Sequence, residues 1–203
     1  QGYLLTLLDG GLEDPSVNRA FLERASKSTD RITGILEDLD QITRMETENL
    51  RLEIRSFDIV ELLKESFETF ELIAKEKNYQ LHFEKTFTSK YVNADRNKLG
   101  QVFTNLISNA ISYGKENGTL LVSILDINDH YLLEFKDDGP GIEPHHLSRL
   151  FERFYRAAPS GVNGSGLGLA IVKEIASQHG ALVKLRSPLA GGRGTAIRLT
   201  WPA

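Results

Sequence analysis

The 203-residue sequence contains no cysteine, which excludes disulfide bonds and thiolate metal sites. No apolar run approaches the ~20 residues of a membrane-spanning helix, and the N-terminus lacks the pattern of a signal peptide. A basic field is also missing, because the formal net charge is −4 and the lysines and arginines are dispersed. Nucleic acid is therefore not an expected partner. What remains is an ordinary globular composition, long enough for one large domain or a domain with an appendage.

The first 50 residues have a helical pattern throughout. Residues 1–8 form a short apolar stretch that ends at two glycines, and Asp14-Pro15 predicts the start of a second helix, with Asp14 as N-cap and Pro15 in the first turn. Apolar residues then recur at alternating spacings of four and three, with one polar member, at Phe21, Ala25, Ser28, Ile32, Ile35, Leu39 and Ile42. Such a seam favours a helical hairpin that dimerises into a four-helix bundle. A single amphipathic helix lying on a globular domain is the alternative.

The remaining chain mixes helical and strand patterns after a junction over residues 45–58. We expect helices over residues 59–75, 95–113 and 167–179, the last one ending at Gly180. Strands are expected over residues 80–87, 119–127, 131–136, 182–187 and 195–201, and the second and third of these form a hairpin around Asn128-Asp129. The irregular alternation favours an α+β layer fold. The expected domains are residues 1–50 and 51–203.

The stretch NGSGLGLAIV, residues 163–172, places Gly164, Gly166 and Gly168 at alternate positions directly before a helical pattern. Glycines let backbone N–H groups approach an anion, and a helix N-terminus attracts negative charge, so the pattern is typical of phosphate binding. It is neither a P-loop nor a dinucleotide fingerprint, because the lysine of the first and the preceding strand of the second are missing. A flexible loop before a helix is the structural alternative.

Three further stretches narrow the choice. NLISNAISY sets Asn105 and Asn109 on one helix face, although asparagine is a poor residue inside helices. DDGPGI follows a strand and combines Asp137 with two glycines, and FERFYRA places aromatic residues among arginines. Each stretch alone has a structural explanation, as buried amides, a turn or core aromatics. Their joint order and spacing are hard to obtain by chance.

This order, N-x-x-x-N, D-x-G-x-G, F-x-x-F, G-x-G-x-G and a closing G-T, resembles the ATP-binding domain of bacterial sensor histidine kinases from about Phe57 onward. The N-terminal helices resemble the dimerisation and phosphoacceptor hairpin of the same family. The resemblance implies a two-layer α/β sandwich of the Bergerat type with a mixed sheet, preceded by a helical hairpin that dimerises as a four-helix bundle.

The resemblance also implies site residues. Asn109 would give its side-chain oxygen to Mg²⁺, Asn105 would lie near the phosphates, and Asp137 would accept a hydrogen bond from the adenine amine. Residues 154–165 resemble a lid over the nucleotide. The other implied nucleotide-binding residues are Tyr113, Gly139, Gly141, Ile142, Arg153, Arg156, Gly164, Gly166, Leu167, Gly168 and Thr195.

The sequence departs from the family pattern in two places. Ser112 stands where the family has a lysine or arginine that points at a phosphate, and Lys115 is the candidate substitute. The family's acceptor histidine lies in H-E-x-x-T-P-L, before a segment that resembles QGYLLTLL, so the acceptor is expected upstream of Gln1. None of the chain's own histidines is expected to accept phosphate; they are His82, His130, His145, His146 and His179.

The implied function is transfer of the γ-phosphoryl group of Mg·ATP to that histidine and on to an aspartate of a response regulator. The chain would then be the cytoplasmic, homodimeric part of a membrane-anchored bacterial sensor. Gyrase-, MutL- and Hsp90-like ATPases are an alternative, but they carry glutamate as general base where this chain has Asn105, whose amide cannot take a proton at neutral pH. A nucleotide-sensing dimer without phosphotransfer is the second alternative, and Ser112 supports it.

Overall fold

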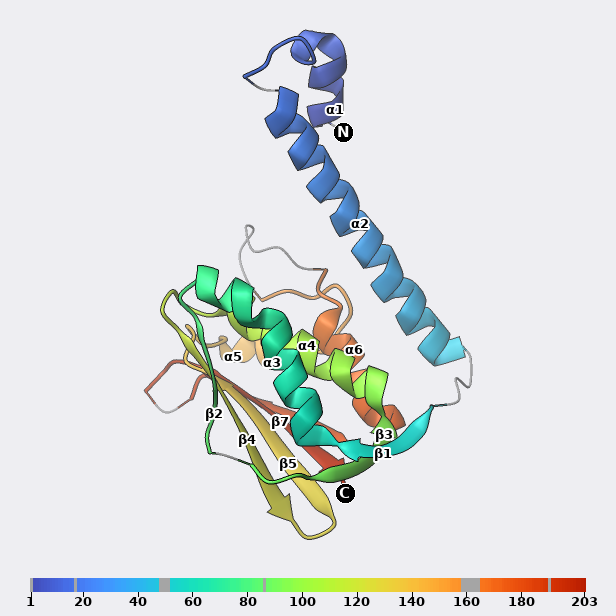
Figure 1. Ribbon diagram of the computed structural model, residues 1–203, viewed down its shortest axis with the longest axis vertical. Helices are drawn as coiled ribbons and strands as arrows, with labels where there is room; N and C mark the ends of the chain where they lie inside the picture. Colours follow the sequence, from blue (N-terminus) through green and yellow to red (C-terminus); the bar gives the residue numbers. More distant parts are fainter. Residues whose placement is uncertain (1, 17, 48–51, 86, 158–164, 190) are drawn as a thin grey trace. The chain divides into compact units, whose positions relative to one another are not determined.

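A computed structural model describes residues 2–16, 18–47, 52–85, 87–157, 165–189 and 191–203. The chain divides into two compact units, residues 1–47 and 48–203 (Figure 1). No helix among the described residues is both long and apolar enough to cross a membrane.

The first unit is helical, as the sequence predicts. It consists of α1 (Gly2–Thr6), the kinked turn η1 (Leu7–Gly11), in which Asp9 and Gly10 have non-helical backbone angles, and the long α2 (Asn18–Thr47). The ring of Tyr3 on α1 lies 5.4 Å from the ring of Phe21 on α2, and the Arg24 guanidinium lies over Tyr3 at 5.6 Å. These contacts hold the short helix against the start of the long one.

The predicted start of the second helix is wrong by a few residues. Instead of capping α2, the Asp14 carboxylate accepts hydrogen bonds from the N–H and the hydroxyl of Ser16, at 2.8 and 2.6 Å. This local pairing closes a separate turn around Pro15, and regular helix begins only at Asn18.

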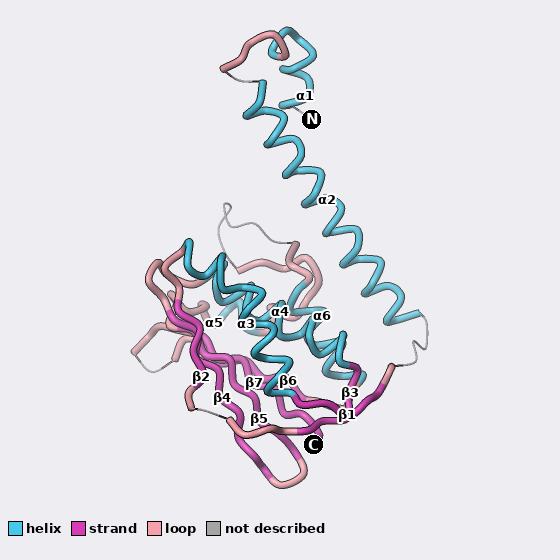
Figure 2. The backbone as a smooth tube through the Cα atoms, in the orientation of Figure 1, coloured by secondary structure: helices cyan, strands magenta, loops and turns pink. Residues whose placement is uncertain are grey.

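The second unit has two layers. Its strands are β1 (Ile54–Asp58), β2 (Gln80–Phe83), β3 (Tyr91–Asp95), β4 (Thr119–Ile127), β5 (His130–Asp137), β6 (Leu182–Arg186) and β7 (Thr195–Pro202). Its helices are α3 (Ile59–Glu76), α4 (Arg96–Tyr113), α5 (Pro144–Leu147) and α6 (Gly168–Gln178). The main sheet has the order β2-β4-β5-β7-β6, with β2 parallel to β4 and the other pairs antiparallel. Helices α3, α4 and α6 cover one face of it (Figure 2), which confirms the predicted two-layer fold with a mixed sheet.

The core between the layers follows from strand alternation. Every second residue of the central strands points toward the helices and is buried: Leu120, Val122, Ile124, Leu133, Phe135, Ile197, Leu199 and Trp201. Because side chains alternate with a period of two, Asp137 continues the row of Leu133 and Phe135. The β5–β7 register places Thr195 opposite Asp137. A carboxylate therefore stands at the end of an apolar row, against the helix layer.

Most predicted elements are confirmed within one or two residues. The helix from Asp95 to Tyr113, the β4–β5 hairpin and the helix that stops at Gly180 are all present. β2 is shorter than predicted and ends at Phe83. The sequence did not predict β1, β3 or α5; β1 and β3 form a separate two-stranded sheet.

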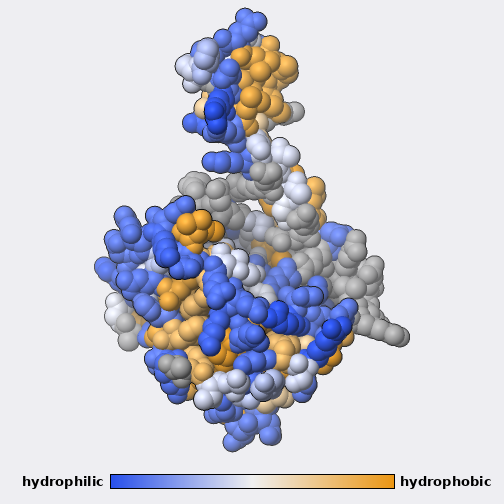
Figure 3. All heavy atoms as spheres, viewed as in Figure 1, coloured by the Kyte–Doolittle hydropathy of each residue, from blue (hydrophilic) through white to orange (hydrophobic). Residues whose placement is uncertain are grey.

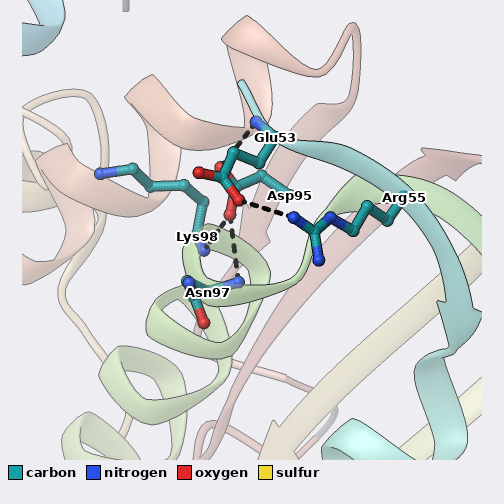
Figure 4. Close-up of polar contacts among 5 residues, drawn as sticks. All are labelled: Glu53, Arg55, Asp95, Asn97 and Lys98. Carbon is teal, nitrogen blue, oxygen red and sulfur yellow. Dashed lines mark hydrogen bonds and ion pairs between the residues drawn. The ribbon is translucent and has the colours of Figure 1, made fainter. Parts of the chain in front are cut away.

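Asp95 joins three parts of this unit. Its carboxylate is buried, with 8% of the residue exposed. One carboxylate oxygen accepts hydrogen bonds from the N–H groups of Asn97 and Lys98, both at 3.1 Å, and the other accepts from the N–H of Glu53 at 3.1 Å (Figure 4). The N–H of Asp95 donates to Nε2 of His179, also at 3.1 Å. The start of α4, the chain entering β1 and the end of α6 thus meet at one residue.

We predict that Asp95→Ala lowers the free energy of unfolding by about 2–3 kcal/mol, because it removes a helix cap and leaves buried N–H groups unpaired. The matched control is Asp126→Ala, which breaks an exposed ion pair with Lys90 and should cost no more than about 1 kcal/mol. Urea unfolding of both variants measures the difference. Equal losses in the two variants would contradict the role of Asp95.

Candidate functional site

Two asparagines lie one turn apart on α4, and both are half-buried. Asn105 faces the start of α6, because a β-carbon at Gly168 would lie 3.5 Å from its Oδ1 atom. Its Nδ2 group is buried and has no hydrogen-bond partner among the described residues. A buried amide donor is costly unless something accepts from it, so Asn105 is suited to a ligand that offers acceptor oxygens.

The N-terminus of α6 offers further donors beside Asn105. The residue before the helix, Leu167, supplies no side-chain cap, and its own N–H donates to Oγ of Ser165 at 3.2 Å. The first N–H groups of an 11-residue helix are thus left without a side-chain acceptor from its N-cap residue, at the positive end of the helix dipole. With Asn105 alongside, this end of α6 is arranged for an anion.

Asp137 ends β5 and stabilises the turn that follows. Its Oδ1 accepts a hydrogen bond from the N–H of Gly139 at 2.9 Å. A β-carbon at Gly139 would lie 2.8 Å from that oxygen, so a larger residue there would have to displace the Asp137 side chain. Burial raises the pKa of Asp137 above its ordinary value, and hydrogen bonds from the backbone of Gly139 and Thr195 offset only part of this effect. The contacts within the protein therefore offset only part of the free-energy cost of burying the Asp137 charge.

Tyr113 and Tyr79 pack around the same turn. The carbonyl oxygen of Tyr113, at the end of α4, lies 3.5 Å from where a β-carbon of Gly139 would be. The Tyr79 ring is 4% exposed and lies so close to Gly118 that a β-carbon there would come within 2.6 Å of it. Burial, with the charges of Asp137 and Asp138, raises the pKa of Tyr79. Sequence analysis did not identify Tyr79 as part of this region.

Ser187 connects the second half of the turn to β7. The N–H of Ile142, next to Gly141, donates to Oγ of Ser187 at 2.7 Å. The Ser187 hydroxyl donates to the carbonyl of Gly194 at 3.0 Å and lies 3.0 Å from Oγ1 of Thr195. Sequence analysis placed Ser187 at the end of a strand and missed this role, because its partners lie elsewhere in the chain and its burial is visible only in the structure.

Lys115 is already engaged within the protein. Its ammonium lies 3.0 Å from Oδ2 of Asp138, whose Oδ1 accepts from the N–H of Thr119 at 2.8 Å. Burial acts to raise the pKa of Asp138, but the Thr119 hydrogen bond and the Lys115 charge bring it below its ordinary value. Lys115 therefore stabilises the turn after β5, and in this arrangement it does not replace the basic side chain missing at Ser112.

The aromatic segment contacts α5 and the glycine stretch. The Tyr155 hydroxyl lies 2.6 Å from Nδ1 of His146, and the Arg149 guanidinium lies over the Tyr155 ring at 4.2 Å. Gly166 has a φ of +76°, and a β-carbon there would come within 2.8 Å of the carbonyl carbon of Phe154. The immediate reason for glycine at 166 is thus the protein's own backbone.

For the arginines of this segment the structure gives position and exposure. Arg153 is exposed and Arg156 is half-buried, on either side of Phe154 and Tyr155. Gly164 lies outside the described residues, so the structure places only the last two of the three glycines.

Comparison with known proteins is consistent with this geometry. Residues 94–203 match the family model described as histidine kinase-, DNA gyrase B- and HSP90-like ATPase. Sensor histidine kinase WalK of Bacillus subtilis (strain 168) is 32% identical over 208 residues, which cover 100% of this chain and 33% of WalK. The chain spans about a third of the length of the curated relatives it matches.

Two solved structures have the same fold. Mycobacterial sensor histidine kinase MprB is 32% identical, with a TM-score of 0.64 over 73% of this chain and 97% of MprB. Acinetobacter baumannii histidine kinase AdeS is 25% identical, with a TM-score of 0.78 over 100% of this chain and 92% of AdeS.

Proposed function

Because this chain belongs to the family of histidine kinase-, DNA gyrase B- and HSP90-like ATPases and is homologous to bacterial sensor histidine kinases, we propose that it is a kinase core. It transfers the γ-phosphoryl group of Mg·ATP to a histidine of a dimerisation helix, and from there to an aspartate of a response-regulator receiver domain. Residues 1–50 serve as the dimerisation hairpin and residues 51–203 bind ATP. We place this core on the cytoplasmic side of the membrane, where ATP is available.

The observation that carries the proposal is the buried amide of Asn105 beside the start of α6, where the N-cap residue Leu167 provides no side-chain cap. Its Nδ2 donates to a phosphate oxygen, and the first N–H groups of α6, near Gly168, bind the same triphosphate. Asp137 accepts from the adenine amine, which supplies the partner that its buried carboxylate lacks. In this proposal Tyr113, Gly139, Gly141, Ile142 and Thr195 would contact the base and ribose. The proposed phosphate contacts are Arg153, Arg156, Gly166 and Leu167, together with Gly164, which lies outside the described residues.

Asn109 is the proposed Mg²⁺ ligand. It lies one turn from Asn105 on the same helix face, so both side chains reach the phosphate region. An amide oxygen is a hard ligand of the kind that Mg²⁺ prefers. When bound, the ion neutralises phosphate charge during transfer. The residues present therefore fit a magnesium nucleotide.

Transfer to a protein histidine is favoured over hydrolysis because the residue at position 105 is not a base that could activate water. At the position where hydrolytic relatives need a proton acceptor, Asn105 offers an amide that does not ionise near neutral pH. An imidazole is itself a good nucleophile, so positioning and charge neutralisation of ATP are sufficient. The second candidate is a nucleotide-binding dimer without transfer. It draws support from Lys115, which pairs with Asp138 and so does not replace the lysine or arginine missing at Ser112.

Phosphotransfer is tested by supplying the acceptor in trans. The chain is incubated with γ-labelled ATP, Mg²⁺ and a separate polypeptide that carries the H-E-x-x-T-P-L motif. We expect acid-labile label on the acceptor and none on the chain's own five histidines. Asn109→Ala should slow the transfer by at least about 100-fold, because it removes a metal ligand.

The remaining outcomes separate the alternatives. Release of inorganic phosphate without labelled acceptor would identify a hydrolytic ATPase. Tight ATP binding with neither product would identify the nucleotide-sensing dimer. Label on any of the five histidines would overturn the assignment of the acceptor.

A homodimer through the helical hairpin is the proposed assembly. Apolar side chains gather on the first unit (Figure 3), and within that unit these are exposed: Leu4, Leu5, Leu8, Leu12, Leu22, Ile32 and Leu36. A second copy would cover the α2 part of this surface and complete a four-helix bundle.

We predict that Ile32→Lys converts the dimer to a monomer, because an unpaired charge would be buried at the seam at a cost of several kcal/mol. Ile32 is 59% exposed within the single chain, so the variant unit still folds. The matched control, Ser26→Lys, adds the same charge on another side of α2 and should remain dimeric. Sedimentation velocity decides this, and a monomeric wild-type chain would reject the bundle.

We predict that Asp137→Asn narrows the preference for ATP over GTP. An ionised carboxylate only accepts hydrogen bonds, and it matches the adenine amine but opposes the guanine carbonyl. A hydrogen bond to a charged group contributes roughly 1.5–3 kcal/mol, so the wild type should prefer ATP by at least about tenfold. The amide introduced by Asp137→Asn can rotate so that its NH2 group donates to the guanine carbonyl, which reduces the difference between the two nucleotides. An unchanged ATP/GTP ratio of dissociation constants would reject Asp137 as the adenine reader.

Stability of the nucleotide-free protein provides the control for this variant. The pKa of Asp137 is raised in the folded protein by burial, so its contribution to stability is present below the unfolded pKa and is lost as the pH rises through the folded pKa. Asp137→Asn avoids that loss. The variant should be at least as stable as the wild type at pH 7, with the difference shrinking as the pH falls through the acidic range. A loss of ATP affinity then cannot be attributed to unfolding.

A further inference from the structure

Three side chains with metal-ligating atoms meet at α5, outside the proposed nucleotide site. They belong to Glu143, the residue before the helix, and to His145 and His146 within it. One ligand atom from each residue lies within 4.8 Å of the other two. None of these residues has a role in the proposed phosphotransfer.

The spacing of Glu143 and His145 suits a tetrahedral ion. Zinc binds imidazole nitrogen and carboxylate oxygen at about 2.0–2.2 Å, so neighbouring ligand atoms of a tetrahedral site are roughly 3.3–3.6 Å apart. Nδ1 of His145 lies 3.3 Å from Oε2 of Glu143. The rings of His145 and His146 are 3.8 Å apart between centroids. Two imidazoles and one carboxylate form a ligand set that zinc favours over magnesium, which prefers oxygen ligands.

A second residue orients one of the imidazoles. Nδ1 of His146 lies 2.6 Å from the hydroxyl of Tyr155, whose ring is covered by the Arg149 guanidinium at 4.2 Å. When Nδ1 carries the proton and donates to Tyr155, Nε2 keeps its lone pair for a metal ion. Metal-bound histidines commonly hydrogen-bond through their other ring nitrogen in this way.

The backbone under the ligands is also restrained. Pro144 occupies the first turn of α5. Its ring fixes its own φ and so restrains the backbone that joins Glu143 to His145. The side chains of Glu143 and His145 are 77% and 65% exposed, so an ion can reach them from solvent. The cluster thus combines a ligand set whose atoms lie within 4.8 Å of one another, one pair at tetrahedral spacing, an orienting partner and an open approach.

We propose that Glu143, His145 and His146 form a binding site for a divalent transition-metal ion, with Zn²⁺ as the best-matched ion and a fourth position open to water. The site is independent of the nucleotide chemistry proposed above. Because His146 contacts Tyr155, a bound ion is linked directly to the aromatic segment that precedes Arg156.

The test is calorimetric titration of the nucleotide-free chain with Zn²⁺, in a buffer that does not coordinate metals and contains excess Mg²⁺. We expect one Zn²⁺ per chain, reversed by a chelator. His145→Ala and His146→Ala should each lower the affinity by more than roughly 100-fold. The matched controls, His82→Ala and His130→Ala, remove exposed histidines elsewhere and should leave it unchanged.

Tyr155→Phe tests the orienting hydrogen bond separately. It retains the ring under Arg149 but removes the hydroxyl, and loss of such a partner typically lowers metal affinity roughly 10–100-fold. His145 is exposed, so His145→Ala keeps the test valid even if His146→Ala fails to fold. The proposal is overturned if no stoichiometric binding occurs, or if His145→Ala binds zinc as well as His130→Ala does. Unchanged affinity in Tyr155→Phe would overturn the role of Tyr155.

Discussion

The position at which α4 begins governs the geometry of the proposed site, and the Asp95 carboxylate determines that position. Its two hydrogen bonds to Asn97 and Lys98 define the first turn of the helix. Successive residues of an α-helix are rotated by about 100°, so a start displaced by one residue would turn Asn105 away from Gly168. The further bonds of Asp95 to Glu53 and His179 tie this start to β1 and to the end of α6. One buried cap therefore helps determine which side chains of α4 face the proposed nucleotide site.

A second constraint comes from the sheet. Asp137 points toward the helix layer because it has the same parity as Leu133 and Phe135, and the pairing of β5 with β4 and β7 holds that parity. A slip of one residue would exchange the two faces of the strand. The cost is a carboxylate buried at the end of an apolar row, as its raised pKa indicates. Functional sites are places where such local cost is retained.

The sequence predicted those parts of the molecule whose evidence is local. α4 and α6 have a helical period and recognisable ends, and β4 and β5 alternate on both sides of an Asn-Asp turn, so their bounds were nearly right. The parts that it missed depend on contacts between distant segments. β1 and β3 are short strands that pair only with each other among the described residues, and the paired residues lie 33 to 41 positions apart. The Ser187 bonds likewise cross 45 residues to reach Ile142, and no local pattern encodes such a partner.

The glycine stretch has a structural reason beside the one that the sequence suggests. Close approach to an anion was the reason predicted for all three glycines, yet Gly166 adopts a positive φ and lies against the backbone of Phe154. Its immediate function is to let the chain pass that segment and enter α6 in the correct direction. Gly168 makes only an ordinary contact with Asn105, at a helix end that its N-cap side chain does not cap. Gly166 therefore first builds the approach to α6, and the proposed anion site uses the helix end that this produces.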